Sequence, residues 1–283
     1  MKLSDILFES EDVDVDDFEK MLETELTNVG QNLLYRGIKF KQKKIPIDVT
    51  TFKKVDTLDY RPPKDTGEYM NDYIESIGKS IFGNKYISRN KNVVFTTLRR
   101  NIAKSFGKVY IIFVPKNYKA ISLRYDPTDN IFLKIGDAIY FSIDDGFEEL
   151  TDYVKLNTNL EKELEQLKEE IYGKNIMYQI NELSDIDKMH KKIIDFLNIL
   201  RGLTTKKSFS KIDDIQEYFD NGFELLEKNT IEYFDSLKFV TAPWEETKAY
   251  EIMINCPWYV MVDEDWFLKY FEYNSFENKY VRK

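Results

Sequence analysis

The chain has 283 residues, of which 42% are hydrophobic and 15% aromatic, so it can bury a sizeable core and is not a disordered protein. Its net charge of −9 opposes passive binding along nucleic acid, because phosphate neutralisation supplies most of that affinity, but allows a small local basic site. Cys256 is the single cysteine and His190 the single histidine, which excludes an intrachain disulfide and a four-ligand structural zinc site and favours a cytosolic protein.

Residues 1–30 are expected to form an acidic tail followed by a helix. The first 15 residues contain a run of acids and lack a long apolar core, unlike a secretory signal. Asp16 and Asp17 can cap a helix that continues to about Val29. No stretch of the chain approaches the roughly 18 apolar residues of a membrane-spanning helix, so no membrane partner is expected.

Residues 31–150 alternate between strand-like apolar runs and short helices. The run from Val109 to Val114, ended by Pro115, has the continuous apolar pattern of a central strand. Thr66 can cap a helix that continues to about Ile81. Further strands are predicted at 33–40, 91–97, 120–125 and 138–143, a short helix at 98–106, a basic patch at 39–44 and a loop at 61–66.

Residues 151–237 change in character and are predicted to be largely helical. Leucines and isoleucines recur at spacings of three and four on otherwise charged segments, and Ser184 with Asp187 resembles a capping arrangement before a helix that Gly202 closes. Strand character returns at 238–240 and at 250–262, and a last helix follows at 266–271. This order predicts an α+β fold in which the helical block is an insertion or lobe and residues 238–283 complete the core; a separate helical domain is the alternative.

Polar residues at the ends of three strand-like runs are the candidates for chemistry. Arg36 lies in Leu-Leu-Tyr-Arg-Gly, Thr96 and Thr97 close Val-Val-Phe-Thr-Thr, and Glu251 opens Glu-Ile-Met-Ile. Burying such groups is costly unless they meet a partner or a ligand. Each also has a structural explanation: an ion pair for the arginine, β-branched packing for the threonines, and a solvated edge charge for the glutamate.

The order arginine, threonine or serine, and glutamate, each on its own strand, resembles the Arg-Ser-Glu class of ADP-ribosyltransferases, and within it a bacteriophage-encoded member. The resemblance covers roughly residues 30–130 and 240–262. The shared pattern includes Arg61-Pro62-Pro63-Lys64-Asp65-Thr66, Phe82-Gly83, Arg89-Asn90, Val94-Phe95-Thr96, Phe106-Gly107, Tyr110 and Phe113-Val114-Pro115. It implies an ADP-ribosyltransferase-like split β core with a helical insertion.

The resemblance also implies a reaction and its participants. NAD is the substrate, no metal takes part, and a host or phage macromolecule, protein or nucleic acid, accepts the ADP-ribose in the bacterial host cytoplasm or at the virion. The catalytic residues would be Glu251, which stabilises the oxocarbenium-like ribose, Arg36, and Thr96, which orients the glutamate. NAD would be bound by Arg36, Gly37, Thr96, Thr97 and Tyr110.

One departure from the family pattern affects the expected activity. Arginine-modifying members carry Glu or Gln two residues before the catalytic glutamate, where this chain has Ala249. The cleft would then modify another acceptor, only hydrolyse NAD, or be inactive. The alternative function is a non-catalytic phage structural or host-interaction protein. His190 is expected at the surface or core edge of a helix, which disfavours a histidine-dependent hydrolase and the histidine-containing polymerase branch of the superfamily.

Overall fold

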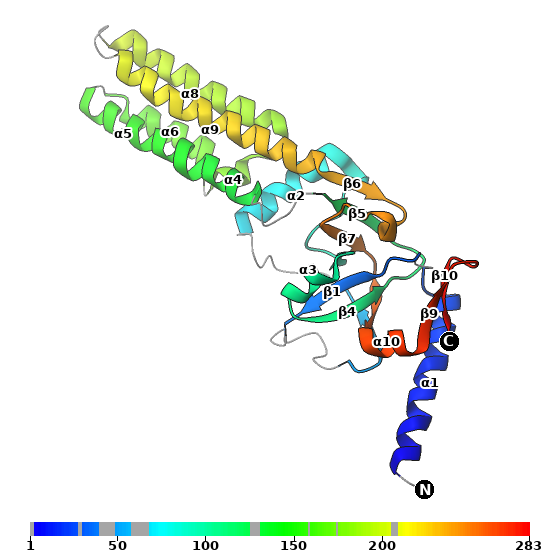
Figure 1. Ribbon diagram of the computed structural model, residues 1–283. Helices are drawn as coiled ribbons and strands as arrows, with labels where there is room; N and C mark the ends of the chain where they lie inside the picture. Colours follow the sequence, from blue (N-terminus) through cyan, green and yellow to red (C-terminus); the bar gives the residue numbers. More distant parts are fainter. Residues whose placement is uncertain are drawn as a thin grey trace. The chain divides into compact units, whose positions relative to one another are not determined.

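The computed structural model of the protein combines helices with antiparallel sheets, which confirms the predicted α+β class (Figure 1). It describes residues 3–27, 30–39, 49–57, 68–124, 131–157, 159–173, 175–204 and 209–283. The chain divides into two compact units. The first consists of Met1–Arg61, Ile87–Asp126 and Ser236–Lys283, and the second of Pro62–Tyr86 and Pro127–Asp235.

Two four-stranded antiparallel sheets form the first unit. The strand order of one sheet is β1-β4-β8-β2, and the order of the other is β3-β7-β5-β6. The strands are β1 Leu34–Ile38, β2 Phe52–Asp56, β3 Val93–Thr96, β4 Lys108–Phe113, β5 Lys119–Leu123, β6 Leu237–Val240, β7 Glu251–Asn255 and β8 Trp258–Asp263. The unit also contains α1 Leu3–Thr24, α3 Arg100–Ser105, the short 3-10 helix Pro243–Glu245, α10 Glu264–Tyr270, β9 Phe271–Asn274 and β10 Lys279–Arg282.

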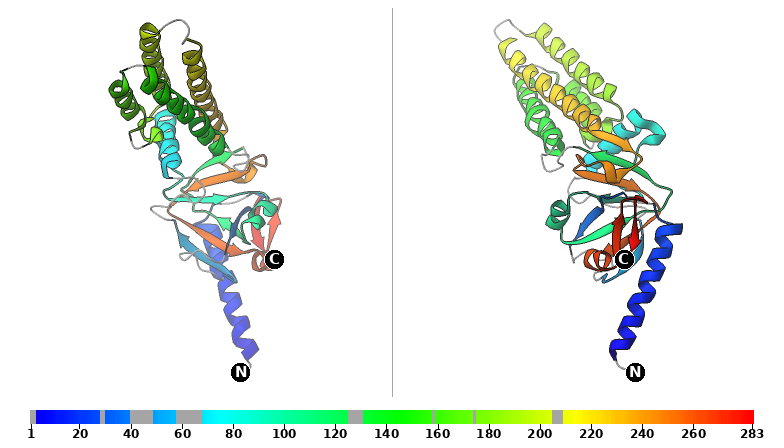
Figure 2. Two further views of the ribbon diagram at one scale, coloured as in Figure 1. Left: turned by 90° about the vertical axis from the view of Figure 1, so that its left-hand side faces the viewer. Right: turned by 45° about the vertical axis from the view of Figure 1, so that its right-hand side comes forward.

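The side chains of β4 alternate between two apolar cores. Ile112 points into a core shared with Val94 and Ile252 of the other sheet, so the two sheets pack face to face there. Phe113 points to the opposite side, where Phe18 of α1 and Phe267 of α10 cover the first sheet. Figure 2 shows the two sheets and these helices from further directions. β4 is therefore a central strand, as its continuous apolar run predicted.

Most of the predicted elements of the first unit are confirmed. The segments 33–40, 91–97, 109–114, 120–125 and 238–240 coincide to within two residues at each end with β1, β3, β4, β5 and β6, the segment 250–262 covers β7 and nearly all of β8, and the segments 98–106 and 266–271 overlap α3 and α10. The cap at Asp16 and Asp17 is wrong, because α1 begins at Leu3 and runs past both residues to Thr24. Strands β2, β9 and β10 were not predicted. Nearly all of the basic patch and the 61–66 loop lie outside the described residues.

The second unit is helical, which confirms the helical prediction for the segment after residue 151. Its elements are α2 Glu68–Phe82, the 3-10 turn Gly83–Lys85, α4 Ile131–Ala138, a π-helical turn Ile139–Ile143, α5 Asp144–Asn157, α6 Glu161–Tyr172, α7 Ile176–Gln179, α8 Leu183–Leu203 and α9 Phe209–Asp235. Within the described residues, none of the helices combines the length and apolarity that a membrane crossing requires.

The strand predicted at 138–143 is wrong. Ile139 and Ile143 are buried and four residues apart, whereas Tyr140 and Phe141 between them are exposed, so the segment has helical rather than alternating periodicity. The turn packs closely on α9, since a Cβ at Gly222 would lie 2.6 Å from Ile143.

The helical unit also has different boundaries from the predicted block at 151–237. It begins at Pro127 and includes α2 from an earlier part of the chain. The hydroxyl groups of Tyr73 in α2 and Thr230 in α9 are 2.5 Å apart in the buried interior. Residues 138–150 therefore belong to this unit and not to the sheets.

Candidate functional site

Strand pairing in the first unit brings the three predicted segments to one corner. The N–H of Tyr35 donates to the carbonyl of Thr97 at 2.7 Å, and the N–H of Thr97 donates back at 2.9 Å, so β1 meets the end of β3. β3 in turn pairs with β7, where Thr96 lies opposite Ile252, and continuing this register by one residue places Thr97 beside Glu251. Two strand spacings, roughly 10 Å, separate the backbones of β1 and β7 at this corner.

The carboxylate of Glu251 is half-buried and paired with an arginine. Nη1 of Arg89 lies 3.3 Å from Oε1 of Glu251, and the side chains are 16% and 21% exposed. Glu251 also lies opposite Leu123 of β5, so its backbone is held between two strands. Its immediate neighbour Ile252 belongs to the core between the sheets, and the alternation of a strand directs Glu251 to the other face.

Arg89 is fixed on the same face by two further contacts. Its guanidinium carbon lies 5.1 Å from the centre of the Phe95 ring, and Nη1 is 3.5 Å from the sulfur of Met253. Phe95 and Met253 are opposite each other across β3 and β7, so Arg89 lies over this pair and reaches Glu251, two residues from Met253 on the same face of β7. Sequence reasoning included Arg89 only in a shared pattern, and no local signal connects positions 162 residues apart.

The two threonines hold the backbone at this corner. The hydroxyl of Thr96 donates to the carbonyl of Ile252 at 3.2 Å, and the hydroxyl of Thr97 accepts from the N–H of Arg99 at 3.1 Å, at the start of α3. Both threonines are buried. Among the described residues, therefore, the hydrogen bond to the Glu251 carboxylate comes from Arg89 and not from the threonine hydroxyls.

Arg36 has a separate partner in the core between the sheets. It shares the face of β1 with Leu34 and Ile38. Its Nη1 donates to the hydroxyl of Tyr259 at 3.2 Å, and its guanidinium carbon lies 5.6 Å from the centre of that ring. The structure thus brings the strand ends of Arg36 and Glu251 together but not their side chains: Arg36 faces the core between the sheets, whereas Glu251 faces the opposite side of its own sheet and pairs with Arg89.

Gly37 and Tyr110 are occupied by packing. A Cβ at Gly37 would lie 1.7 Å from the carbonyl oxygen of Ala103, so the close approach that this glycine permits is that of α3. Tyr110 is opposite Arg36 in the register of β1 and β4, and only 2% of it is exposed. In this structure Gly37 allows α3 to pack closely on β1, and Tyr110 is part of the buried core.

The position that departs from the family pattern is also buried. Ala249 is fully buried, and its N–H donates to the carbonyl of Glu246 at 2.8 Å. Next to it, the ring of Tyr250 lies 5.8 Å from the guanidinium carbon of the exposed Arg99. A side chain at position 249 therefore has no access to an acceptor in this conformation.

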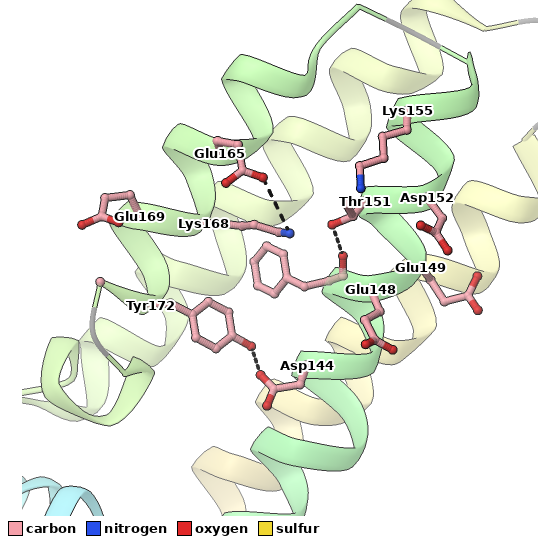
Figure 3. A pocket seen from close by; sticks show the side chains of 12 residues that line it. Asp144, Glu148, Glu149, Thr151, Asp152, Lys155, Glu165, Lys168, Glu169 and Tyr172 are labelled. Atoms are coloured by element: carbon pink, nitrogen blue, oxygen red, sulfur yellow. Dashed lines mark hydrogen bonds and ion pairs between the residues drawn. The ribbon is translucent and has the colours of Figure 1, made fainter.

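The described residues also form concave regions away from this corner. In the first unit, a cavity of about 210 Å³ beside α3 and α10 is lined by ion pairs, including Lys108 with Asp263 at 3.1 Å. In the second unit, a groove of about 790 Å³ lies between α5 and α6. Figure 3 shows Tyr172 reaching across this groove to hydrogen-bond Asp144, and burial raises the pKa of both groups. Among the described residues, no cluster of His, Cys, Asp or Glu is arranged to hold a metal ion.

The single histidine takes part in packing between two helices. The His190 ring of α8 stacks on Phe223 of α9 with centres 5.2 Å apart. Its Nε2 lies 2.7 Å from Oδ1 of Asp220. These contacts give His190 a structural role in the packing of α8 against α9.

Comparisons with protein-family models, with curated proteins and with solved structures found no match to this chain. The corner where β1, β3 and β7 meet is therefore the candidate functional site.

Proposed function

We propose that the protein transfers ADP-ribose from NAD to a macromolecular acceptor, with Glu251 as the catalytic carboxylate. The observation that carries the proposal is the bridge between Tyr35 of β1 and Thr97 directly after β3, together with the pairing of β3 with β7, which gathers the strand ends that carry the arginine, the threonines and the glutamate. In the resemblance to the Arg-Ser-Glu class, the arginine, the threonine or serine and the glutamate follow one another along the chain in the same order, each on its own strand. An ADP-ribosyltransferase-like split core is the corresponding proposal for the fold of the first unit.

The chemistry uses a carboxylate that is oriented before the reaction begins. The N-glycosidic bond breaks, its electron pair leaves with nicotinamide, and positive charge develops at C1′ of the ribose until an acceptor nucleophile attacks there. Glu251 would accept a hydrogen bond from the ribose 2′-hydroxyl and stabilise this charge. Its partial burial favours that role, because charges interact more strongly where water is excluded.

Arg36 would bind the pyrophosphate of NAD, since a planar guanidinium with forked donors fits phosphate oxygens. In the described conformation this guanidinium is bonded to Tyr259 in the core between the sheets, whereas Glu251 faces the other side of its sheet, so joint binding of NAD requires Arg36 to leave this core. The acceptor, of host or phage origin, would be selected by residues other than the buried Ala249, and hydrolysis of NAD by water is the simplest form of the reaction.

A second candidate function is a non-catalytic structural or host-interaction protein with this fold. The observation that favours it is the satisfaction of both charged groups within the protein: Arg36 by Tyr259 and Glu251 by Arg89. Charged residues whose role is only structural are paired within the protein in the same way.

The two functions differ in the effect of Glu251→Gln, which keeps the shape of the side chain and removes its charge. With labelled NAD and bacterial lysate, we expect turnover to fall by about 10²–10³-fold, equivalent to roughly 3–4 kcal/mol, because the lost interaction acts mainly in the transition state. NAD affinity and melting temperature should change little. The control is Glu264→Gln, which removes another arginine-paired glutamate of the same unit and should leave turnover intact.

Two results would count against the proposal. Equal turnover by the wild type and Glu251→Gln would remove Glu251 from the mechanism. A wild-type protein that neither binds nor consumes NAD would support the non-catalytic function.

A further inference from the structure

We infer that Arg89 is a positioning residue for Glu251 in the proposed reaction. The inference rests on the proposed function and adds a residue that the resemblance did not assign to this role. The pair is formed by Nη1 of Arg89 and Oε1 of Glu251, 3.3 Å apart. Within the part of the chain that the structure describes, this contact engages one carboxylate oxygen, which leaves Oε2 to accept the 2′-hydroxyl of the substrate ribose.

The surroundings of Arg89 explain why its guanidinium can act as a fixed reference. The guanidinium contacts the ring of Phe95 and the sulfur of Met253 on the surface of β3 and β7. The register of the two strands holds these two residues opposite each other. Only 16% of the Arg89 side chain is exposed. An arginine on open surface would lose most of its pairing energy to solvent and side-chain entropy, whereas this one is already ordered by packing.

The nearest alternatives for orienting Glu251 are engaged elsewhere. The resemblance assigns this role to the threonine at the end of the preceding strand. In the structure, the Thr96 hydroxyl donates to a backbone carbonyl, and the Thr97 hydroxyl accepts from the start of α3. The orienting contact therefore comes from a charged donor on the segment before β3.

A charged, planar donor has a specific effect on a catalytic carboxylate. It fixes the direction of one oxygen through a charge-assisted hydrogen bond, so less reorganisation is needed when positive charge develops at the ribose. Lysine can supply the charge but not the flat guanidinium that lies over the Phe95 ring and beside the Met253 sulfur. The contribution should therefore appear in the rate of the chemical step, not in the binding of NAD.

Steady-state kinetics of NAD consumption by the full chain test this inference. We expect Arg89→Gln to lower kcat by about 10–100-fold, as when an orienting group behind a reacting side chain is removed, with KM for NAD within about twofold of the wild type. Arg89→Lys should recover part of the loss. In the background of Glu251→Gln, Arg89→Gln should cause no further loss, because Arg89 acts through that carboxylate. Arg282→Gln, which breaks the pair with Asp16 in the same unit, is the control.

Each other outcome overturns the inference. An unchanged kcat shows that Arg89 does not position Glu251, a raised KM at unchanged kcat shows that it binds NAD directly, and multiplicative losses in the double variant show that it acts independently. If Arg89→Gln does not fold, judged by its melting temperature, Arg89→Lys carries the same comparison of kcat and KM. A wild type without NAD turnover would overturn the proposed function itself, whereas an active wild type with an unaffected variant overturns only the role of Arg89.

Discussion

At the scale of single residues, burial determines how Cys256 reacts. Only 2% of this residue is exposed, and burial raises the pKa of its thiol from 9.0 to about 12. Near pH 8 the reactive thiolate is therefore about a thousandfold rarer than for an ordinary thiol. We expect a thiol reagent to label the native protein slower by at least that factor and to label it rapidly in denaturant. Rapid labelling of the native protein would show that Cys256 is accessible.

The same pKa has a consequence for stability at high pH. Because the folded-state pKa is raised, the folded protein keeps a proton that the unfolded chain has already lost. The unfolding free energy should therefore fall as the pH rises from about 9 towards about 12. Cys256→Ala removes this term, so its stability relative to the wild type should improve across that pH range, as measured by urea unfolding at several pH values. A difference that does not vary with pH would contradict this assignment.

Gly37 is required by the packing of α3. A methyl group there would overlap the carbonyl oxygen of Ala103, which belongs to the backbone and cannot rotate away. We expect Gly37→Ala to destabilise the first unit by about 1–3 kcal/mol or more in urea unfolding. Gly202→Ala is the matched control, because no atom of the described residues lies within 4 Å of its added carbon and alanine favours a helix, so it should be neutral or slightly stabilising.

The candidate site shows which residues a sequence can indicate. Arg36, Thr96 and Glu251 were identified because a charged or polar group at the end of an apolar run is locally visible. Their partners were not, because Arg89 is 162 positions from Glu251, and Tyr259 is 223 positions from Arg36. Such contacts depend on strand order, which no local pattern specifies.

At the scale of elements, the start of α8 gives a direct test of helix capping. The sequence favoured Ser184 with Asp187, whereas the structure has a capping box of Glu182 and Asp185, whose carboxylate accepts from the N–H groups of Asn181 and Glu182. Asp185→Ala should cost the helical unit about 1 kcal/mol of unfolding free energy. Asp187→Ala should have almost no effect, and equal losses would contradict the capping assignment.

Long apolar runs predicted their elements, and short or charged ones did not. β4 was identifiable because the six residues 109–114 form a continuous apolar run that Pro115 ends. β2 was not, because Lys53 and Lys54 interrupt its apolar residues, and only pairing with β8 makes it a strand. The segment 138–143 is too short for its sequence to distinguish the helical period from the alternation of a strand. In the structure it is helical and packs against Gly222 of α9.

At the scale of the whole molecule, the class and the helical block were predictable, but the boundaries between the units were not. Composition changes at about residue 151, so that was the visible boundary. The helical unit of the structure also includes α2. Tyr73 of α2 contacts Thr230, which is 157 positions away in the sequence. An amphipathic helix such as α2 reveals that it has a buried face but not which partner covers it.

This division predicts which deletions the protein tolerates. Among the described residues, the two apolar cores centred on β4 draw all their members from the three segments of the first unit. Replacing 62–86 and 127–235 by short Gly-Ser linkers should therefore leave a protein that unfolds cooperatively in urea. Deleting only 155–235 should cause aggregation, because it leaves α2, α4 and most of α5 without α9 and exposes side chains such as Tyr73, Ile143 and Leu150, which are fully buried. Light scattering and circular dichroism of the two variants side by side provide the measurement. A soluble, folded product of the shorter deletion together with aggregation of the longer one would show that the two units are not the folding units of this chain.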